Sequence, residues 1–526
     1  MAIRVRRFLT IPIILVVCAL AGGIFGPRVT AQNGSSESQI EESLRRISQV
    51  FHAAEEHYAT PVDADKAIYG GAIPGMLRSL DPHSNFFDRK SFGLLREEQR
   101  GRYYGVGMTV TPRSGQTIVL APFVGSPAYK AGLRPGDVIV QVDETSTENL
   151  STTEVAELLK GPKGTTVHIH VMREGQDQPL QFVIVRDEIP RLSIEHAFFL
   201  SPNVGYIRIS TFNETTSQEL REKLREMDPS TLKGLVLDLR NNPGGLLAEG
   251  VSVADMFLER GQLIVSHHGR NSREKRYTAV RGNRGNNFPL VVVINRYTAS
   301  AAEIVSGAIQ DHDRGLIVGE SSFGKGLVQT VYPLGEDTGL ALTTAKYYTP
   351  SGRLIQRDYS SVSLYDYYYH KDSAAPQTDV HSTDAGRTVY GGGGITPDAE
   401  IPEQSLNRFQ QRLARNYTFF NFAKRYLAEN STIASNFEAD AAVLDRFRRF
   451  LQEQNIEFEE AEIQENLDYI RQRIKLELFL SVFGMDEAYK LEIAADNQIL
   501  KAVELLPQAA ALVENAKQVI ARKETP

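Results

Sequence analysis

The sequence predicts a multidomain protein of mixed α/β class, with a β-rich domain and an α/β core between helical N- and C-terminal regions. Its 526 residues are enough for three or four domains at about 150 residues each. Between residues 105 and 188, short β runs alternate with Gly, Pro and polar turns. From residue 204 to about 402, short apolar runs alternate with helical segments, and from 406 to 523 the pattern is helical throughout.

The composition excludes several classes of protein. Charged residues make up 23% and hydrophobic residues 41%, which argues against a disordered chain and against a polytopic membrane protein. The net charge is −7 and no basic block is evident, so nucleic acid is not an expected partner. The single cysteine, Cys18, excludes an intramolecular disulfide, a Cys-rich zinc site and a thiol nucleophile in the folded body.

Residues 1–31 have the pattern of an export signal. Three arginines precede the apolar stretch Phe8–Phe25, and Val29-Thr30-Ala31 then offers a cleavage site. The stretch is also just long enough to cross a bilayer, so a cleaved signal and a retained anchor at residues 8–25 both stay open. We expect an exported protein of the bacterial cell envelope, in the periplasm or on the outer face of the cytoplasmic membrane, with membrane contact only through this segment.

The rest of the chain divides into regions by its hydrophobic pattern and composition. Apolar residues at three- and four-residue steps predict helices over 38–60 and 64–80. Buried core strands are expected at 235–237, 290–294 and 316–318. A segment rich in Tyr, Ser, Asp and Gly predicts a long surface insertion with no packing pattern. The expected regions are an N-terminal helical region (36–100), a β-rich domain (101–188), the α/β core (189–402, with the insertion at 357–394) and a C-terminal helical region (403–526).

The β-rich domain contains two informative strings. Tyr103–Met108 opens a strand with two glycines, and Ala131–Ile139 reads A-G-L-R-P-G-D before an apolar run. Together they resemble a PDZ domain, in which consecutive backbone N–H groups receive a terminal carboxylate beside a strand edge that pairs with an extended peptide. The alternative is that the glycines only form a tight turn. The residues expected to bind a peptide are Tyr104, Gly105, Val106, Gly107 and Met108.

A candidate nucleophile follows the expected strand at 290–294. Ser300 stands at the start of a helical pattern, where backbone N–H groups and the helix dipole favour an oxyanion. The other interpretation is a capping box, because Glu303 follows three residues later. His312 is about 18 Å away along an unbroken helix and cannot serve as the base. His267 and His268 are expected in a polar loop, and no metal-ligand spacing occurs in the sequence.

Lysine is the remaining candidate for the base. Lys325 lies among glycines in Gly319–Gln329, which allows close backbone approach. At its ordinary pKa a lysine is neutral in only about 1 of 2,500 molecules at pH 7, so burial must lower the pKa. Gln329, four residues on, can orient the amine without adding charge. The same string matches a phosphate-binding loop, but Gly326 stands where the Ser or Thr should be.

A third string, Asp238–Gly245, follows the expected strand at 235–237. Its Gly244 or Gly245 N–H group can face a developing oxyanion, although the string can also be a simple strand-ending turn. With the three strings in this order, the sequence resembles the carboxyl-terminal processing serine peptidases, also called tail-specific proteases, over roughly residues 40–402. The later strings Tyr347–Arg353 and Gly394–Asp398 resemble that family too.

The resemblance implies a crotonase-like α/β peptidase core and a Ser-Lys mechanism. It places the nucleophile on Ser300, the base on Lys325 and the lysine-orienting amide on Gln329, and it adds Ala301 to Gly244 and Gly245 as backbone oxyanion donors. Two departures are visible. The nucleophile motif reads T-A-S-A-A-E with a single serine, and Lys160 stands where the family commonly has an Arg linked to PDZ regulation.

The sequence therefore predicts an exported serine endopeptidase that needs no cofactor and no metal, and acts on proteins or peptides with free C-termini. Two other classes stay open: an exported PDZ adaptor or holdase with a silent core, and a crotonase-like enzyme acting on acyl thioesters. The apolar faces of the terminal helical regions allow a homodimer, and they can equally pack on their own core. A regulatory adaptor is a further partner left open.

Overall fold

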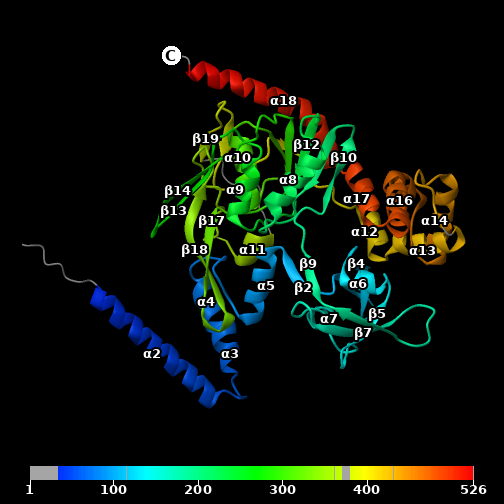
Figure 1. Cartoon of the computed structure of the whole chain (residues 1–526), viewed down its shortest axis with the longest axis horizontal. Coiled ribbons are helices and arrows are strands. Elements are labelled where there is room, and N and C mark those ends of the chain that lie inside the picture. Colours follow the sequence, from blue (N-terminus) through cyan, green and yellow to red (C-terminus); the bar gives the residue numbers. More distant parts are fainter. Residues whose placement is uncertain (1–32, 114, 361, 370–378, 431, 525–526) are drawn as a thin grey trace, which may run out of the picture. The chain divides into compact units, whose positions relative to one another are not determined.

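The structure is a computed structural model that describes residues 33–524 except 114, 361, 370–378 and 431 (Figure 1). The predicted export segment lies outside these residues. The chain divides between Met76 and Leu77 into two compact units. Among the helices described here, none is long and apolar enough to cross a membrane.

The first unit is helical. The predicted helix 38–60 is observed as α2 (Asn33–His57), and its apolar residues Ile40, Leu44 and Ile47 are exposed. The second predicted helix, 64–80, is not continuous. It is divided into α3 (Ala64–Ala67), a π-helical turn (Ile68–Ala72) and α4 (Ile73–Arg78). The turn contains Gly70-Gly71, and glycine is a poor former of regular helix.

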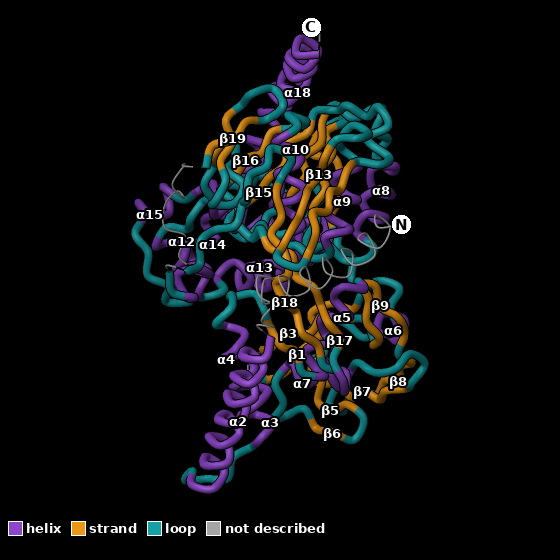
Figure 2. The backbone as a smooth tube through the Cα atoms, turned by 90° about the vertical axis from the view of Figure 1, so that its left-hand side faces the viewer, coloured by secondary structure: helices purple, strands orange, loops and turns teal. Residues whose placement is uncertain are grey.

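The core of the second unit is a six-stranded sheet in the order β10-β11-β12-β15-β16-β21. All neighbours pair in parallel except β10 and β11. The three predicted core strands are confirmed and fully or largely buried, and β15 and β16 run side by side (Figure 2). The bounds are β10 His196–Ser201, β11 Val204–Arg208, β12 Gly234–Asp238, β15 Leu290–Ile294, β16 Leu316–Gly319 and β21 Ala399–Glu400.

Alternate residues of these strands pack on two different layers. Leu235, Leu237 and Ile294 face one layer, formed mainly by α8 (Thr216–Glu226), α9 (Leu247–Asp255) and α10 (Ala301–Asp311). Val236 and Val293 face the other, formed by residues of α17 (Met485–Ala494) and α18 (Asn497–Glu524). Because side chains alternate with period two along a strand, continuous apolar runs are needed for a sheet covered on both faces.

A second sheet adjoins the core, in the order β1-β18-β13-β14 with β17 also paired to β18. His267 and His268 belong to β13, so their predicted place in a polar loop is wrong. The apolar residues Leu263–Val265 begin this strand, and the histidines continue it into an antiparallel pair with β14. The bounds are β1 Asn85–Phe87, β13 Leu263–Gly269, β14 Ser272–Thr278, β17 Leu327–Pro333 and β18 Gly339–Tyr348.

The β-rich domain contains a sheet in the order β3-β4-β5-β7-β8, with β6 also paired to β5. It has a hydrophobic core of its own. The helix α5 (Arg89–Arg100) precedes it, and β2 (Arg102–Gly105) pairs with β9 (Asp187–Pro190) at its two chain ends. The strands are β3 Met108–Arg113, β4 Gln116–Pro122, β5 Val138–Val142, β6 Thr145–Ser146, β7 Thr166–Met172 and β8 Leu180–Val185; the helices are α6 Pro127–Ala131 and α7 Thr152–Leu159.

The C-terminal region, expected as one helical region, divides into two parts. The helices α12 to α16 enclose a separate cluster that includes Phe447, Ile470 and Ile474. Gly484, with φ = 89°, ends α16, and the following α17 and α18 pack on the core sheet instead. The bounds are α12 Arg408–Arg415, α13 Thr418–Asn430, α14 Ala441–Glu453, α15 Glu460–Glu465 and α16 Leu467–Phe483.

Most described residues of segment 357–394 are exposed or half-buried, but a few of them are packed, which the sequence pattern does not indicate. Tyr367 in α11 (Leu364–Tyr369) is 2% exposed. At Gly394 a Cβ atom would lie 2.5 Å from the carbonyl oxygen of Ser322, so this glycine permits a close backbone approach. Aromatic residues without a regular spacing give no sequence signal of burial. The segment also contains the short hairpin of β19 (Val380–Ser382) and β20 (Thr388–Tyr390).

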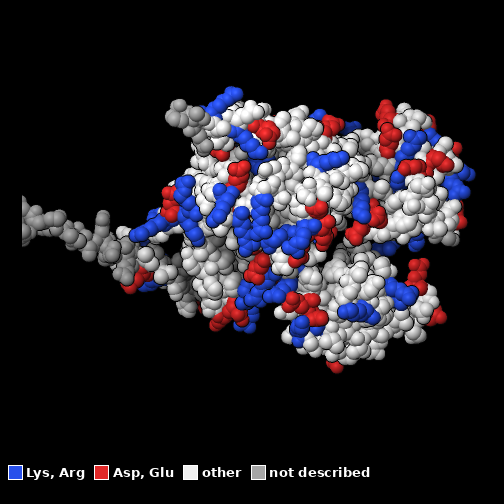
Figure 3. Space-filling model, turned by 45° about the horizontal axis from the view of Figure 1, so that its top comes forward, with Lys and Arg blue, Asp and Glu red and all other residues white. Residues whose placement is uncertain are grey.

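Basic side chains are less evenly spread than the sequence indicated. On the face drawn in Figure 3, several Lys and Arg side chains lie close together. The hairpin of β13 and β14 also exposes Arg270, Arg273, Lys275 and Arg276, with Glu274 as the acidic residue among them. A local basic cluster is therefore present, although the whole chain is acidic.

Candidate active site

Ser300 lies in the turn between β15 and α10, where the sequence places it. Thr298 closes this turn, since its hydroxyl accepts from the Asn295 amide at 2.9 Å and donates to the Leu239 carbonyl at 2.8 Å. The backbone of Ser300 has φ = 55° and ψ = −116°. A non-glycine residue in this conformation costs on the order of 1–3 kcal/mol, and such strain is concentrated at functional sites.

Glu303 holds the Ser300 segment and the Lys325 segment together. Its carboxylate is fully buried, and one oxygen accepts from the amides of Ser300 at 2.8 Å and Lys325 at 2.9 Å. The other oxygen accepts from the Gly324 amide at 2.7 Å and the Ser322 hydroxyl at 2.5 Å. Burial raises the pKa of Glu303 above its ordinary value, although these hydrogen bonds oppose the shift. The sequence indicated only a helix cap here, and the longer-range partners were missed.

Lys325 lies half-buried in the loop between β16 and β17. Its amine donates to Oε1 of Gln329 at 3.2 Å, which is the contact predicted from their spacing. Burial lowers the pKa of Lys325, while the charges of Glu303 and Asp81 oppose the shift. The loop leads into a strand and not into a helix, so the phosphate-loop interpretation lacks the helix N-terminus that it requires.

The glycines beside Lys325 are needed for packing. At Gly326 a Cβ atom would lie 2.9 Å from the Gln356 amide nitrogen, and at Gly324 it would lie 2.9 Å from Cβ of Arg357, with φ = 88°. The loop therefore runs directly against the segment that follows β18. A side chain at either glycine would prevent this close approach.

Tyr347 links the two segments a second time. Its ring is 1% exposed, and its hydroxyl donates to the carbonyls of Ser300 at 3.1 Å and of Lys325 at 2.5 Å. Burial raises the pKa of Tyr347 well above its ordinary value, which keeps the hydroxyl protonated as a donor. In the sequence, Tyr347 is recognisable only as part of the Tyr347–Arg353 string. An aromatic residue at the end of a strand gives no signal of this bridging role.

The loop after β12 lies directly against Ser300. At Gly244, with φ = 95°, a Cβ atom would lie 2.7 Å from Cβ of Ser300 and 2.9 Å from the amide nitrogen of Ala301. The Gly244 amide, however, donates to Oδ1 of Asn242 at 2.8 Å. An Asx turn thus engages this amide in the structure, and the role of Gly244 as an oxyanion donor stays a prediction. The amides of Gly245 and Ala301 remain for that role.

These residues border one cavity of about 380 Å³. The polar lining includes Ser300, Lys325 and Gln329, together with the backbone of Gly244 and Gly245. The remaining lining is mainly apolar and comes from β1, α5, α9, α10, β17 and β18, through Phe87, Leu95, Leu247, Ile304, Leu327, Val331 and Ala341. His312 lies at the opposite end of α10, hydrogen-bonded to Asp384 at 2.7 Å and to the Leu263 carbonyl at 2.6 Å.

The residues predicted to bind a peptide terminus lie where the chain enters the β-rich domain. Tyr104 and Gly105 belong to β2 and pair with β9, and Val106 and Met108 are buried in the domain core. Gly107 has φ = 76°, and its carbonyl accepts from the Ser126 hydroxyl at 2.7 Å. Val106 and Met108 are buried and glycine has no side chain, so capture of a carboxylate here would depend mainly on backbone amides.

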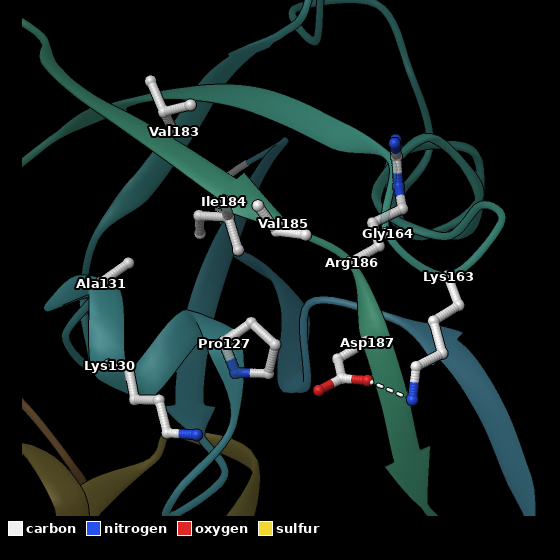
Figure 4. Close-up of a pocket in the computed structure, with 10 residues that line it drawn as sticks. All are labelled: Pro127, Lys130, Ala131, Lys163, Gly164, Val183, Ile184, Val185, Arg186 and Asp187. Atoms are coloured by element: carbon white, nitrogen blue, oxygen red, sulfur yellow. Dashed lines mark ion pairs between the residues drawn. The ribbon is translucent and has the colours of Figure 1, made fainter.

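A separate hollow on the same domain lies between α6 and β8 (Figure 4). Pro127 and Ile184 face each other across it, and Lys163 pairs with Asp187 at 2.9 Å on its rim. None of the residues Tyr104–Met108 lines this hollow. No pattern in the sequence indicates this hollow.

Comparison with family models covers most of the described chain. Residues 203–361 match peptidase family S41 and residues 118–173 match a PDZ domain. Residues 409–462 match the C-terminal helical domain of a probable PDZ-protease, and residues 27–91 match the N-terminal domain of the activating protease CtpB. The fold is thus that of an S41 peptidase with a PDZ domain and a helical C-terminal domain.

Curated relatives point to the same family. A carboxy-terminal-processing protease of Bartonella bacilliformis is 40% identical over 327 residues, which are 61% of this chain and 74% of the relative. A carboxyl-terminal-processing protease of Synechocystis is 37% identical, over 54% of this chain and 68% of the relative. Carboxy-terminal processing protease CtpB of Bacillus subtilis is 32% identical, over 61% of this chain and 67% of the relative.

Among solved structures, a photosystem II D1 C-terminal processing protease is 32% identical, with a TM-score of 0.35, and covers 65% of this chain and 84% of its own. The sequence matches, the S41 and PDZ models and the serine-lysine cavity agree with one another. We conclude that this chain belongs to the carboxy-terminal processing proteases of the serine-type peptidase family S41.

Proposed function

We propose that this chain is an exported endopeptidase that cleaves proteins with a Ser-Lys dyad. The neutral amine of Lys325 takes the proton of the Ser300 hydroxyl, and the serine oxygen attacks a peptide carbonyl. The ammonium returns the proton to the leaving amine, and water then hydrolyses the acyl-enzyme with the amine again as base. The observation that carries this proposal is the hydrogen bond of Lys325 to a neutral amide within the cavity that Ser300 lines.

The neighbouring groups suit each step. A carboxylate partner would hold the lysine in its charged form, whereas the Gln329 amide does not. The oxygen that becomes negative would accept from the Gly245 and Ala301 amides, at the N-terminus of α10. The apolar lining of the cavity supports a preference for an apolar substrate side chain beside the cleaved bond.

The PDZ domain supports selection of substrates by their C-terminal tails. Such domains bind an extended chain end through backbone hydrogen bonds, so a frayed or unfolded tail is preferred to a folded one. With the export pattern of residues 1–31, this indicates protein processing or quality control in the cell envelope. The exposed apolar residues Ile40, Leu44 and Ile47 of α2 support a homodimer through this helix. We also propose a crotonase-like fold for the peptidase core and a regulatory adaptor as a partner.

The test compares the full-length wild type with Ser300→Ala and Lys325→Ala on an unfolded reporter protein with an apolar tail, without metal or nucleotide. Mass spectrometry follows the products. Residues of the same type that do not line the cavity supply matched controls, the half-buried Ser252→Ala in α9 and the exposed Lys346→Ala in β18. We expect the controls to cleave at the wild-type rate and the two site variants to lose at least about 1,000-fold in kcat/KM.

A second reporter with an amidated C-terminus tests tail selection. We expect a lower kcat/KM on this reporter, because the terminal carboxylate is lost. Equal cleavage by wild type and Ser300→Ala would show that another site is responsible. Tail binding without cleavage would favour the adaptor or holdase.

A further inference from the structure

The turn between α4 and β1 reaches the lysine site from a distant part of the sequence. Asp81 is 6% exposed, and its carboxylate accepts from the amides of His83 at 2.8 Å and Ser84 at 2.7 Å. It also accepts from the Ser84 hydroxyl at 2.8 Å. Burial raises the pKa of Asp81, but the hydrogen bonds from Ser84 and His83 outweigh burial and leave the pKa below its ordinary value. The ionised carboxylate therefore fixes the backbone of the turn.

The turn is also fixed from outside. The Ser84 hydroxyl accepts from the Thr343 amide of β18 at 3.2 Å, and Asn85 begins the pairing of β1 with the same strand. On the other side the Tyr368 hydroxyl donates to the Pro82 carbonyl at 2.9 Å. The turn is thus held between β18 and the α11 segment.

The consequence is a fixed position for the His83 carbonyl. This carbonyl accepts from Nε2 of Gln329, whose Oε1 in turn accepts from the Lys325 amine. A carbonyl oxygen can only accept, so the nitrogen of the glutamine amide must face His83 and the oxygen must face the lysine. The amide cannot rotate by 180° without placing two acceptors against each other.

This orientation matters chemically because a neutral amine has one lone pair. When Oε1 faces it, the amine donates an N–H to the glutamine and keeps its lone pair for the Ser300 proton. In the opposite orientation the Nε2 hydrogens would point at the amine and could occupy that lone pair. The productive orientation is thus selected by the backbone of the turn.

We infer that Asp81 is a positioning residue for the peptidase reaction, acting through the His83 carbonyl on Gln329. The inference rests on the proposed function of Ser300 and Lys325. It assigns to the Asp81–Ser84 turn the task of holding the glutamine amide so that the lysine can act as a base. The side chain of His83 has a different partner, the Tyr367 hydroxyl at 2.9 Å.

A double-mutant cycle on the full-length chain tests this coupling. In the wild-type background we expect Asp81→Ala to lower kcat about 10- to 100-fold with KM changed less than about twofold. In a Gln329→Ala background the same substitution should lower kcat less than about twofold, because the glutamine through which Asp81 acts on the lysine is already absent. If Asp81→Ala does not fold, Ser84→Ala is a milder variant, with an expected loss of about 3- to 10-fold.

Asp88→Ala is the matched control. Asp88 is the N-cap of α5 and accepts from the Ser91 amide at 2.7 Å, so its loss removes a similar hydrogen bond seven residues further on. We expect the Asp88 variant to change kcat less than about twofold in both backgrounds. A crystal structure of the Asp81 or Ser84 variant adds a readout independent of activity: the Lys325–Gln329 hydrogen bond should be lost.

Equal losses of kcat from Asp81→Ala in both backgrounds would overturn the inference, and so would an unchanged Gln329 amide in the variant structure. If either result appears while Ser300→Ala is inactive, the proposed function stands and only the role of the turn is wrong. If Ser300→Ala cleaves like wild type, the proposed function itself is wrong.

Discussion

The loops after β12 and β16 border the same cavity but are held by different parts of the chain. The β12 loop is fixed by neighbouring strand ends: Asn241 and Asn295 exchange two hydrogen bonds of 2.9 Å, and Asn242 donates to the Ile209 carbonyl at 2.8 Å. The lysine loop depends on segments far away in sequence. Its amine reaches, through Gln329, a carbonyl 246 residues from that glutamine.

The difference shows two ways of building an active site. The oxyanion side is made from short loops at the carboxyl ends of adjacent strands, so the sheet itself brings its parts together. The base side is assembled only when the turn before β1, the β18 strand and α11 have packed around Lys325. We therefore expect the oxyanion side to tolerate little change in geometry, and the base side to be more sensitive to conditions.

The largest effect is expected on the oxyanion side, from Gly245→Ala. Gly245 has φ = 143°, and a Cβ atom would overlap the carbonyl oxygen of Phe212. We expect kcat/KM to fall at least about 1,000-fold, because the loop must move away from Ser300. Gly392→Ala is the control, since Gly392 has φ = 79° with no atom within 4 Å of its Cβ position. Activity close to wild type in Gly245→Ala would contradict a rigid oxyanion loop.

Arg240→Ala tests the support behind this loop. Arg240 pairs with the fully buried Asp238 and reaches Asp496 at 2.7 Å and Gln498 at 2.8 Å, before and within α18. Its loss leaves the Asp238 charge without its cation, so we expect a destabilisation of about 3–5 kcal/mol in urea unfolding. Arg173→Ala, which breaks the Arg173–Asp137 pair in the PDZ domain, is the control and should leave the unfolding of the core unchanged.

On the base side, acid should weaken the structure through His83. Burial and the charge of Lys325 lower the pKa of His83 to about 4, below its ordinary value. Between that value and about 6.5 the unfolded chain binds more protons than the folded chain, so stability falls as the pH falls through this window. The loss at pH 4 is on the order of 3 kcal/mol. We expect the free energy of unfolding, measured in urea, to differ less between pH 7 and pH 4.5 in His83→Gln than in wild type.

His312 provides a control of opposite sign. Burial lowers its pKa, but the hydrogen bonds to Asp384 and the Leu263 carbonyl and the nearby negative charges outweigh this and raise it. The stability it contributes is present below its unfolded pKa and is lost as the pH rises through the folded value. His312→Gln should therefore cost more stability at pH 4.5 than at pH 7. The same pH trend in both variants would mean that general charge repulsion dominates.

The smallest effect is expected from the link between the two sides. Tyr347→Phe removes the hydroxyl that bridges the Ser300 and Lys325 carbonyls. We expect the free energy of unfolding to fall by about 1–2 kcal/mol and kcat to be about 5- to 10-fold lower. Tyr348→Phe is the control, because the Tyr348 ring stacks on His268 instead. An unchanged kcat in Tyr347→Phe would show that Glu303 alone holds the two segments together.

The same contrast explains what the sequence could predict. The strands, the Ser300 turn and the Lys325–Gln329 contact follow from local patterns and spacing, and the observed elements agree with them. The Asx turn that occupies the Gly244 amide is also local, and the N-N-P-G-G string could have indicated it.

The missed features depend on tertiary packing. Nothing in residues 81–84 points to Gln329, and helical periodicity shows which face of α18 is apolar without showing which layer covers it. The roles of the site residues in catalysis remain predictions, which the variants above test.

The packing of α18 on the central sheet bears on how the enzyme is made. The helix begins at Asn497, and its residues Ile499, Ala502 and Leu506 cover Val236 and Val293. Since α18 follows both strands in the chain, a nascent chain exposes this face of the sheet on the ribosome until α18 itself has been made. Translation order thus sets when the central sheet can be covered on both faces.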